Sequence, residues 1–89
     1  MIEIVIDALR PILKNKEIRI EASTVLIGGD GIIDSLGLVE LCLRLEDAAI
    51  REGFEFDWTS ENAMSQSRGI FRNIRSLTDE FSRQKLQQS

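Results

Sequence analysis

The beginning of the chain has the hydrophobic pattern of an amphipathic helix. Its apolar residues recur at steps of three and four, as they do when one side of a helix faces a core. These residues are Ile2, Val5, Ile6, Leu9, Ile12 and Leu13. Pro11 has no N–H to donate to the carbonyl oxygen of Asp7, so we expect the helix to kink or to end near this proline.

Residues 15–33 have no sustained helical period and are predicted to form a long loop. Residues 18–21 alternate like a strand, but no second convincing strand is available to pair with them. A loop held on the core by apolar side chains is therefore favoured. Its glycines fit a turn before the next helix, because the chain lacks the GxxxxGK[ST] pattern of a nucleotide-binding loop. The expected anchors are Ile18, Ile20, Val25, Leu26 and Ile27.

A second helix is predicted from Ser35 to about Glu52. Asp34 is a favourable N-cap residue, and Gly53 is a typical residue at the end of a helix. The positive end of this helix, with its free N–H groups, would favour a negatively charged group attached at Ser35.

The apolar residues of the second helix fall into two groups on different sides. The first group is expected to pack inward and comprises Leu38, Leu41, Cys42, Leu45 and Ala49. The second group comprises Leu36, Val39, Leu43 and Ile50, with Glu40, Glu46 and Asp47 beside it. We interpret the second group as a partly exposed docking surface. The alternative is that all of these residues are buried in a central helix, and for Ile50 the pattern favours neither interpretation.

The rest of the chain predicts an extended link and two further helices. Phe54, Phe56 and Trp58 alternate with acidic residues and are expected to fill the core. A short helix is expected within residues 60–67. Ser76, followed three residues later by an acidic side chain, is predicted to cap a last helix.

These elements predict an all-α fold in a single domain over residues 1–89. We expect a small antiparallel-type bundle of three main helices plus one short helix, with the long loop between the first two helices. Residues 2–84 are expected to be ordered, and residues 85–89 to form a flexible, frayed tail.

The charge is unevenly distributed along the chain. Of the net −4, residues 1–67 carry six basic and thirteen acidic residues, whereas residues 68–89 carry five basic and two acidic ones. The acidic part should repel nucleic acid and anionic membranes and attract basic protein surfaces. No run of about 20 apolar residues and no signal-peptide pattern is present, so we expect a cytoplasmic protein without membrane insertion.

The sequence does not favour an enzyme. A GxSxG or GDSL motif around Ser35 would need glycine in place of Ile33, and the chain has no histidine to act as the usual base. Cys42 lies in an apolar helical stretch and is expected to be a core side chain. Without histidine or a second cysteine, no metal site is expected.

One segment and the order of the elements carry a family resemblance. The segment Ile33-Asp34-Ser35-Leu36-Gly37-Leu38-Val39-Glu40-Leu41 resembles the signature of acyl carrier proteins, which are phosphopantetheine-dependent carriers. The predicted elements over residues 2–84 resemble this family too. The Gly31-Ile32-Ile33 spacing and the long segment from Trp58 to Arg75 depart from fatty-acid carriers and favour a specialised bacterial-type member.

The resemblance implies a carrier that does not itself catalyse a reaction. Ser35 would hold a covalent 4'-phosphopantetheine arm taken from coenzyme A by a phosphopantetheinyl transferase, with Mg²⁺ only in the transferase complex. Asp34 matches the aspartate that precedes the family's modified serine. The positions that match the family's partner-facing helix are Leu36, Val39, Glu40, Leu43, Glu46 and Asp47.

The expected role is to tether acyl or related intermediates as thioesters. A monomeric carrier would present them to acyl-loading and acyl-processing enzymes with basic docking surfaces, in fatty-acid, polyketide or related biosynthesis. Two alternatives remain open: a peptidyl or aminoacyl carrier, and an unmodified helical protein–protein interaction module.

Overall fold

A computed structural model describes residues 1–13, 17–27, 31–58 and 70–88. Within these residues the chain forms three α-helices and no strand, which confirms the predicted all-α class. The helices are α1 (Ile2–Leu9), α2 (Ser35–Arg51) and α5 (Ile74–Gln88). The short helix expected within residues 60–67 lies outside the described residues.

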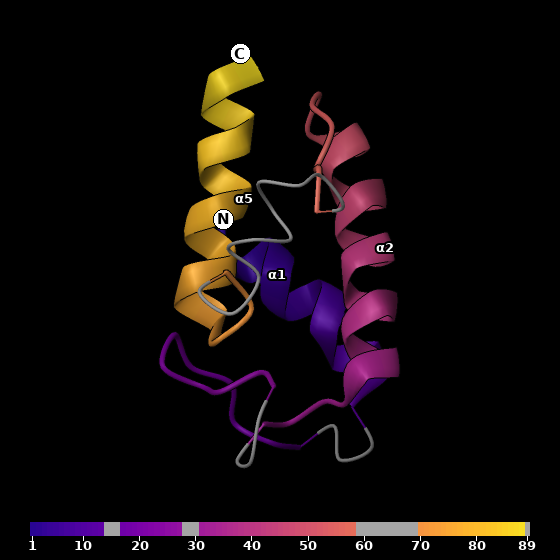
Figure 1. Ribbon diagram of the computed structural model, residues 1–89, viewed down its shortest axis with the longest axis vertical. Coiled ribbons are helices and arrows are strands. Elements are labelled where there is room, and N and C mark those ends of the chain that lie inside the picture. The colour runs from indigo at the N-terminus through magenta and orange to yellow at the C-terminus, as the bar shows by residue number, and fades with distance from the viewer. Residues whose placement is uncertain (14–16, 28–30, 59–69, 89) are drawn as a thin grey trace.

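The three helices pack around one core (Figure 1). α2 and α5 stand on opposite sides, and α1 lies between them and contacts both. The colours of Figure 1 show that α2 and α5 run in the same direction. The antiparallel arrangement that we expected therefore does not describe this pair, because their direction depends on the path of the chain between them and not on their apolar patterns.

Pro11 shortens the first helix, as its missing N–H predicts. α1 ends at Leu9. A 3-10 turn follows over Arg10–Ile12, and Pro11 lies at the beginning of that turn. At that position the missing N–H leaves no hydrogen bond broken. Val5 and Leu9 are fully buried, so α1 uses its apolar face for the core.

The core is built largely from the inner face of α2, the aromatic link and α5. Phe81 of α5 lies at its centre and is fully buried. The ring of Phe54 meets it edge-on at 4.9 Å between centroids, and the ring of Phe56 lies tilted at 5.2 Å. Such arrangements stabilise aromatic pairs beyond the burial of their surface. The alternation of aromatic and acidic residues therefore predicted the inward side of this link correctly.

Residues 17–27 are fastened both to the core and to the start of α5. Leu26 is fully buried, and its N–H donates to the carbonyl oxygen of Arg72 at 3.0 Å. The N–H of Ile74 donates back to the carbonyl oxygen of Thr24 at 3.1 Å. These bonds flank an isolated antiparallel bridge between Val25 and Asn73. The chain before α2 is thus held by α5, which is distant in the sequence. Of the other expected anchors, Ile20 and Ile27 pack half-buried against the core, and Ile18 and Val25 are also half-buried.

The last helix begins two residues earlier than the predicted cap. The Asn73 Oδ1 atom accepts a hydrogen bond from the Ser76 N–H at 2.8 Å, and the Ser76 hydroxyl accepts one from the Asn73 N–H at 3.2 Å. This reciprocal pair is the geometry of a capping box in which Asn73 occupies the N-cap position. The prediction of Ser76 as N-cap is therefore wrong, because the serine lies inside the first turn.

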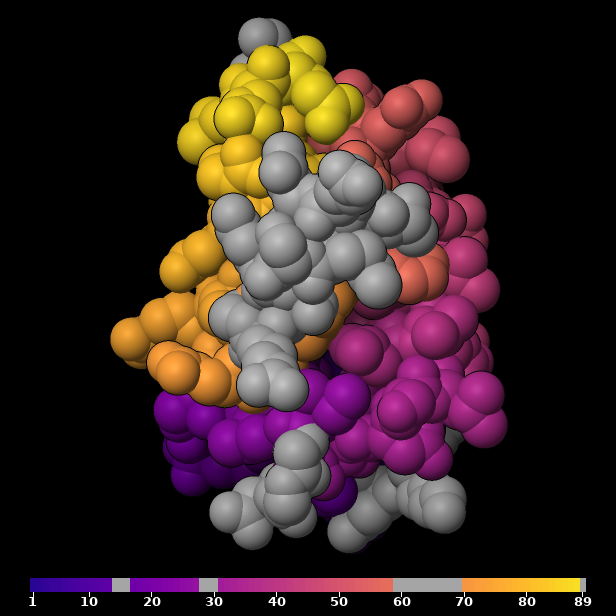
Figure 2. All heavy atoms as spheres, in the orientation of Figure 1, coloured from indigo at the N-terminus to yellow at the C-terminus, as the bar shows by residue number. Residues whose placement is uncertain are grey.

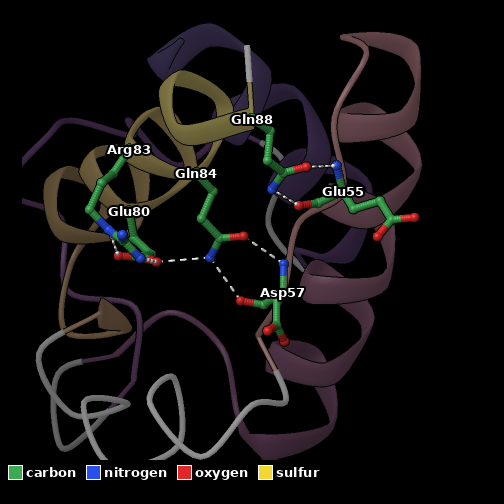
Figure 3. Close-up of polar contacts among 6 residues, drawn as sticks. All are labelled: Glu55, Asp57, Glu80, Arg83, Gln84 and Gln88. Atoms are coloured by element: carbon green, nitrogen blue, oxygen red, sulfur yellow. Dashed lines mark hydrogen bonds and ion pairs between the residues drawn. The ribbon is translucent and has the colours of Figure 1, made fainter.

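The C-terminal helix also continues past Lys85, where we expected a frayed tail. α5 reaches Gln88, whose side-chain amide donates to the carbonyl oxygen of Glu55 and accepts from its N–H, at 2.8 and 2.9 Å (Figure 3). Lys85 Nζ lies 3.2 Å from Glu52 Oε1. These contacts with the link after α2 give the last turn partners that the local sequence pattern does not reveal.

We expect Leu26→Ala to lower the free energy of unfolding by about 2–5 kcal/mol, because it removes a fully buried side chain that fastens the segment before α2. Leu43→Ala is the matched control, since Leu43 is 50% exposed and its truncation leaves little cavity. Urea unfolding followed by circular dichroism measures both. Equal losses in the two variants would contradict this assignment of Leu26 to the core.

Candidate functional site

Ser35 is the first residue of α2, and its position is fixed by Asp34. The Asp34 backbone is extended, and its Oδ1 atom accepts a hydrogen bond from the Gly37 N–H at 2.8 Å. Both Asp34 and Ser35 are exposed. The capping predicted from the sequence is confirmed, and it leaves the Ser35 hydroxyl accessible at the positive end of the helix.

Close backbone packing fixes the path of the chain just before Ser35. The N–H groups of Ile32 and Ile33 donate to the carbonyl oxygens of Val25 and Leu26 at 3.2 and 3.1 Å. A Cβ atom on Gly31 would lie only 2.6 Å from the Leu26 carbonyl oxygen, so this close approach requires glycine. The start of α2 is therefore tied to the buried Leu26. Gly28 and Gly29 lie outside the described residues.

An open cavity of about 560 Å³ borders the first turn of α2. Its lining includes Ile12, Ile18, Ile32 and Ile33, together with Asp34 and Leu36 on either side of Ser35. Sequence reasoning did not place these isoleucines at the site. Ile18, Ile32 and Ile33 belong to a segment without helical period, and Ile12 belongs to the apolar pattern of the first helix. Neither pattern says which of these residues meet.

The second apolar group of α2 is exposed. The exposed fractions are 82% for Leu36, 44% for Val39, 50% for Leu43 and 68% for Ile50. The inner group is buried at Leu41, Cys42, Leu45 and Ala49, and Leu38 packs half-buried against it. The alternative in which all these residues are buried is therefore wrong, for Ile50 as well. We call the exposed group Leu36, Val39, Leu43 and Ile50 the outer stripe. In Figure 2, α2 forms the edge of the molecule on the side away from α5.

The three predicted acidic residues do not lie together. At about 100° per residue, Glu46 falls on the same edge of the outer stripe as Ser35, whereas Glu40 and Asp47 fall on the opposite edge. Glu40 is paired with Arg44 at 3.6 Å. Asp47 is exposed and lines an open groove of about 480 Å³ between α1 and α2, with Arg44 and Arg51 nearby.

Glu46 accepts a hydrogen bond from a residue for which we expected no polar role. The indole N–H of Trp58 donates to Glu46 Oε1 at 2.9 Å, and both residues are half-buried. The partner lies twelve residues away in the extended link. The pair could not be predicted, because it depends on how that link packs against α2.

Cys42 is fully buried on the inner face of α2, as expected. Burial, together with the negative charge of Glu46 one turn later, raises the pKa of the thiol to about 12. The thiol is therefore protonated at neutral pH and is a poor nucleophile.

The described part of the chain contains no group of three or more His, Cys, Asp or Glu side chains arranged to hold a metal ion. None of its helices combines the length and the apolar character that a membrane span needs. A scan against models of known protein families, a search of curated proteins and a search of solved structures found no match to this chain.

We expect Asp34→Ala to destabilise the protein by about 1 kcal/mol, because the Gly37 N–H loses its side-chain acceptor. Asp34→Asn keeps an acceptor oxygen at the same position and should cost less. Chemical denaturation of the three proteins checks this order. Equal stability of the alanine variant and the wild type would show that the cap contributes nothing.

We expect the free energy of unfolding to fall as the pH rises from about 9 to 12. In this range the unfolded chain loses the Cys42 proton, with an ordinary pKa of 9.0, while the folded chain keeps it. The slope from this group approaches about −1.4 kcal/mol per pH unit. Denaturant melts at several pH values measure it.

Cys42→Ala supplies the control for this slope. The variant loses stability at every pH because of the cavity, but its decline above pH 9 should be shallower than that of the wild type. The absence of tyrosine simplifies the comparison. Identical slopes in the two proteins would contradict the raised pKa of Cys42.

Proposed function

We propose that this protein is a carrier of acyl or related groups, attached as thioesters to a 4'-phosphopantetheine arm on Ser35. The observation that carries the proposal is the exposed serine at the capped start of α2, next to an exposed apolar stripe on the same helix. This arrangement supports a protein that is modified at one residue and recognised through the adjacent surface. In this proposal the chain is a specialised bacterial-type member of the acyl carrier family, with a four-helix bundle and a long loop before α2.

The attachment reaction is a phosphoryl-group transfer in the active site of a phosphopantetheinyl transferase. The Ser35 hydroxyl oxygen forms a bond to the phosphorus that carries the pantetheine arm in coenzyme A. The bond from that phosphorus to the adenosine 3',5'-bisphosphate leaving group breaks, and the hydroxyl proton passes to a base of the transferase. Mg²⁺ belongs to that complex and neutralises the phosphates.

The local structure of this chain suits the product. A phosphodiester on Ser35 would lie at the positive end of α2, where unpaired N–H groups favour negative charge. Asp34 already binds the Gly37 N–H through its own carboxylate, so the cap does not need the serine hydroxyl. Modification should therefore leave the helix intact.

The outer stripe supports a transient protein partner. Exposed apolar residues beside carboxylates favour partners that present apolar and basic side chains, and electrostatic attraction speeds their encounter. A carrier needs such short-lived contacts, because it must leave one enzyme before it meets the next. We propose a monomeric cytoplasmic carrier whose partners are the transferase and acyl-loading and acyl-processing enzymes, in fatty-acid, polyketide or related biosynthesis, with peptidyl or aminoacyl cargo as the alternative.

A second candidate is an unmodified interaction module. It is favoured by the extent of the outer stripe, which continues to Ile50, 68% exposed in the last turns of α2 and far from Ser35. In that case the stripe would bind its partner without an arm, and Ser35 would be an ordinary residue at the start of a helix.

Incubation with coenzyme A, Mg²⁺ and a broad-specificity transferase separates the two candidates. We expect intact-protein mass spectrometry to show a single added arm on the wild type and none on Ser35→Ala. Ser23→Ala is the matched control, because Ser23 is also exposed but does not begin a helix, and it should be modified like the wild type.

Circular dichroism should show that Ser35→Ala keeps its helices, because Asp34 supplies the cap. An unmodified wild type beside a competent control carrier would favour the interaction module. An arm on Ser35→Ala would show that the attachment residue is misassigned.

A further inference from the structure

A hydrogen bond from Trp58 fixes the position of the Glu46 carboxylate. Its Oε1 atom accepts the Trp58 indole N–H at 2.9 Å, and both residues are half-buried. The carboxylate therefore lies between α2 and the end of the extended link at Trp58. Because an indole N–H is neutral, this bond orients the carboxylate without cancelling its charge.

The extended link is held by α5 up to the residue before Trp58. The side-chain amide of Gln84, which is 6% exposed, donates to the carbonyl oxygen of Asp57 at 2.8 Å and accepts from its N–H at 2.6 Å. One helical turn later, Gln88 makes the same pair of bonds with Glu55. Figure 3 shows the two glutamines side by side, reaching from α5 to the link. Each glutamine side chain donates to the carbonyl oxygen and accepts from the N–H of one residue of the link, as the backbone of a neighbouring β-strand would.

The side chains of the link reinforce this attachment. Phe54 and Phe56 alternate with the residues bound by the glutamines, and both are buried against Phe81 of α5. The link is therefore fixed by its backbone and by its apolar side chains just before Trp58. Trp58 directly follows this fixed segment, and its indole N–H donates to Glu46.

Glu46 borders the C-terminal half of the outer stripe. Leu43 lies three residues before it and Ile50 four residues after it, which makes both its neighbours on the helix surface. Ser35 lies on the same edge, eleven residues or about 16 Å away along the helix axis. A partner lying on the stripe with its reactive centre near Ser35 would meet Glu46 at the other end of the contact.

The carboxylates on the two edges of the stripe differ in their neighbours. On the far edge, Glu40 is paired with Arg44 at 3.6 Å, and Asp47 lines the groove that also contains Arg44 and Arg51. Glu46 instead has a neutral partner that occupies one of its two carboxylate oxygens. A carboxylate already held in one orientation loses less side-chain entropy when it binds a cation, and its remaining lone pairs can accept from a guanidinium or ammonium group.

We propose that Trp58 is a positioning residue that presents Glu46 as a fixed acceptor for an arginine or lysine side chain of a protein partner seated on the outer stripe. The inference rests on the partner surface of the proposed function and adds the residue that organises it. The partner is identified by its chemistry: an apolar face that covers Leu43 and its neighbours, with a basic side chain at the Glu46 edge.

The test uses two synthetic helical peptides as probes. The first carries leucines on one face and arginines beside them, and the second replaces each arginine with citrulline, which has nearly the same shape but no charge. The variants are Trp58→Phe, which keeps an aromatic ring but removes the N–H, Glu46→Gln, and the double variant. Asp79→Asn is the control, because Asp79 is an exposed carboxylate on α5 and not on the helix of the outer stripe. Isothermal titration calorimetry gives each Kd.

We expect Trp58→Phe and Glu46→Gln each to weaken binding of the arginine peptide by roughly 3-fold to 10-fold, the effect of one hydrogen bond in a partly exposed contact. The double variant should bind no more weakly than Glu46→Gln, because both changes remove the same interaction. Neither change should alter binding of the citrulline peptide, and Asp79→Asn should leave both Kd values within about 2-fold of the wild type.

The wild-type protein supplies a second readout that needs no variant. The chain has a single tryptophan, so its indole N–H resonance is unambiguous in a nitrogen-15 spectrum. We expect the arginine peptide to shift this resonance at lower peptide concentration and further than the citrulline peptide. Equal responses to the two peptides would overturn the proposal even if Trp58→Phe fails to fold.

The remaining outcomes overturn the proposal in different ways. Loss of binding in Glu46→Gln but not in Trp58→Phe would mean that Glu46 acts without being positioned. Wild-type protein that binds neither peptide would exclude a basic partner, and concentration-dependent self-association that Leu43→Ala abolishes would assign the stripe to a second copy of the chain. Because the unmodified protein is used, failure of arm transfer to Ser35 would reject the carrier function and leave this result unaffected.

Discussion

The burial of the inner face of α2 is the interaction on which the other features depend. Leu41, Cys42 and Leu45 have no exposed surface, so the helix cannot rotate about its axis without exposing them. Once its rotation is fixed, the opposite face must point outward. The exposure of the outer stripe and the raised pKa of Cys42 are both consequences of this packing. The start of α2 is set by a second contact, the attachment of the preceding segment through the buried Leu26.

Local patterns predicted the elements that are determined locally. The end of α1 near Pro11 and the start of α2 at Asp34 follow from the chemistry of single residues, and the two faces of α2 follow from helical period. The start of α5 was misplaced, because Asn73 and Ser76 are both good capping residues. The choice between them depends on the bridge from Asn73 to Val25, nearly fifty residues earlier.

The candidate site also has a part that local patterns predicted and a part that they did not. Ser35, Asp34 and the outer stripe could be predicted because they lie on one helix with a clear pattern. The partner of Glu46 and the isoleucines beside Ser35 could not, because both depend on how distant segments meet. The glutamines of α5 show why. Gln84 and Gln88 look like ordinary polar residues of a helix end, yet they hold the link that carries Trp58.

The central claim is that Ser35 is the attachment residue of a carrier, and peptide mapping tests it most directly. Wild-type protein would be treated with coenzyme A, Mg²⁺ and a broad-specificity transferase, digested, and analysed by tandem mass spectrometry. The account predicts one phosphopantetheine arm, located on Ser35. An arm on any other serine, or wild-type protein that stays unmodified while a control carrier in the same reaction is fully converted, would contradict it.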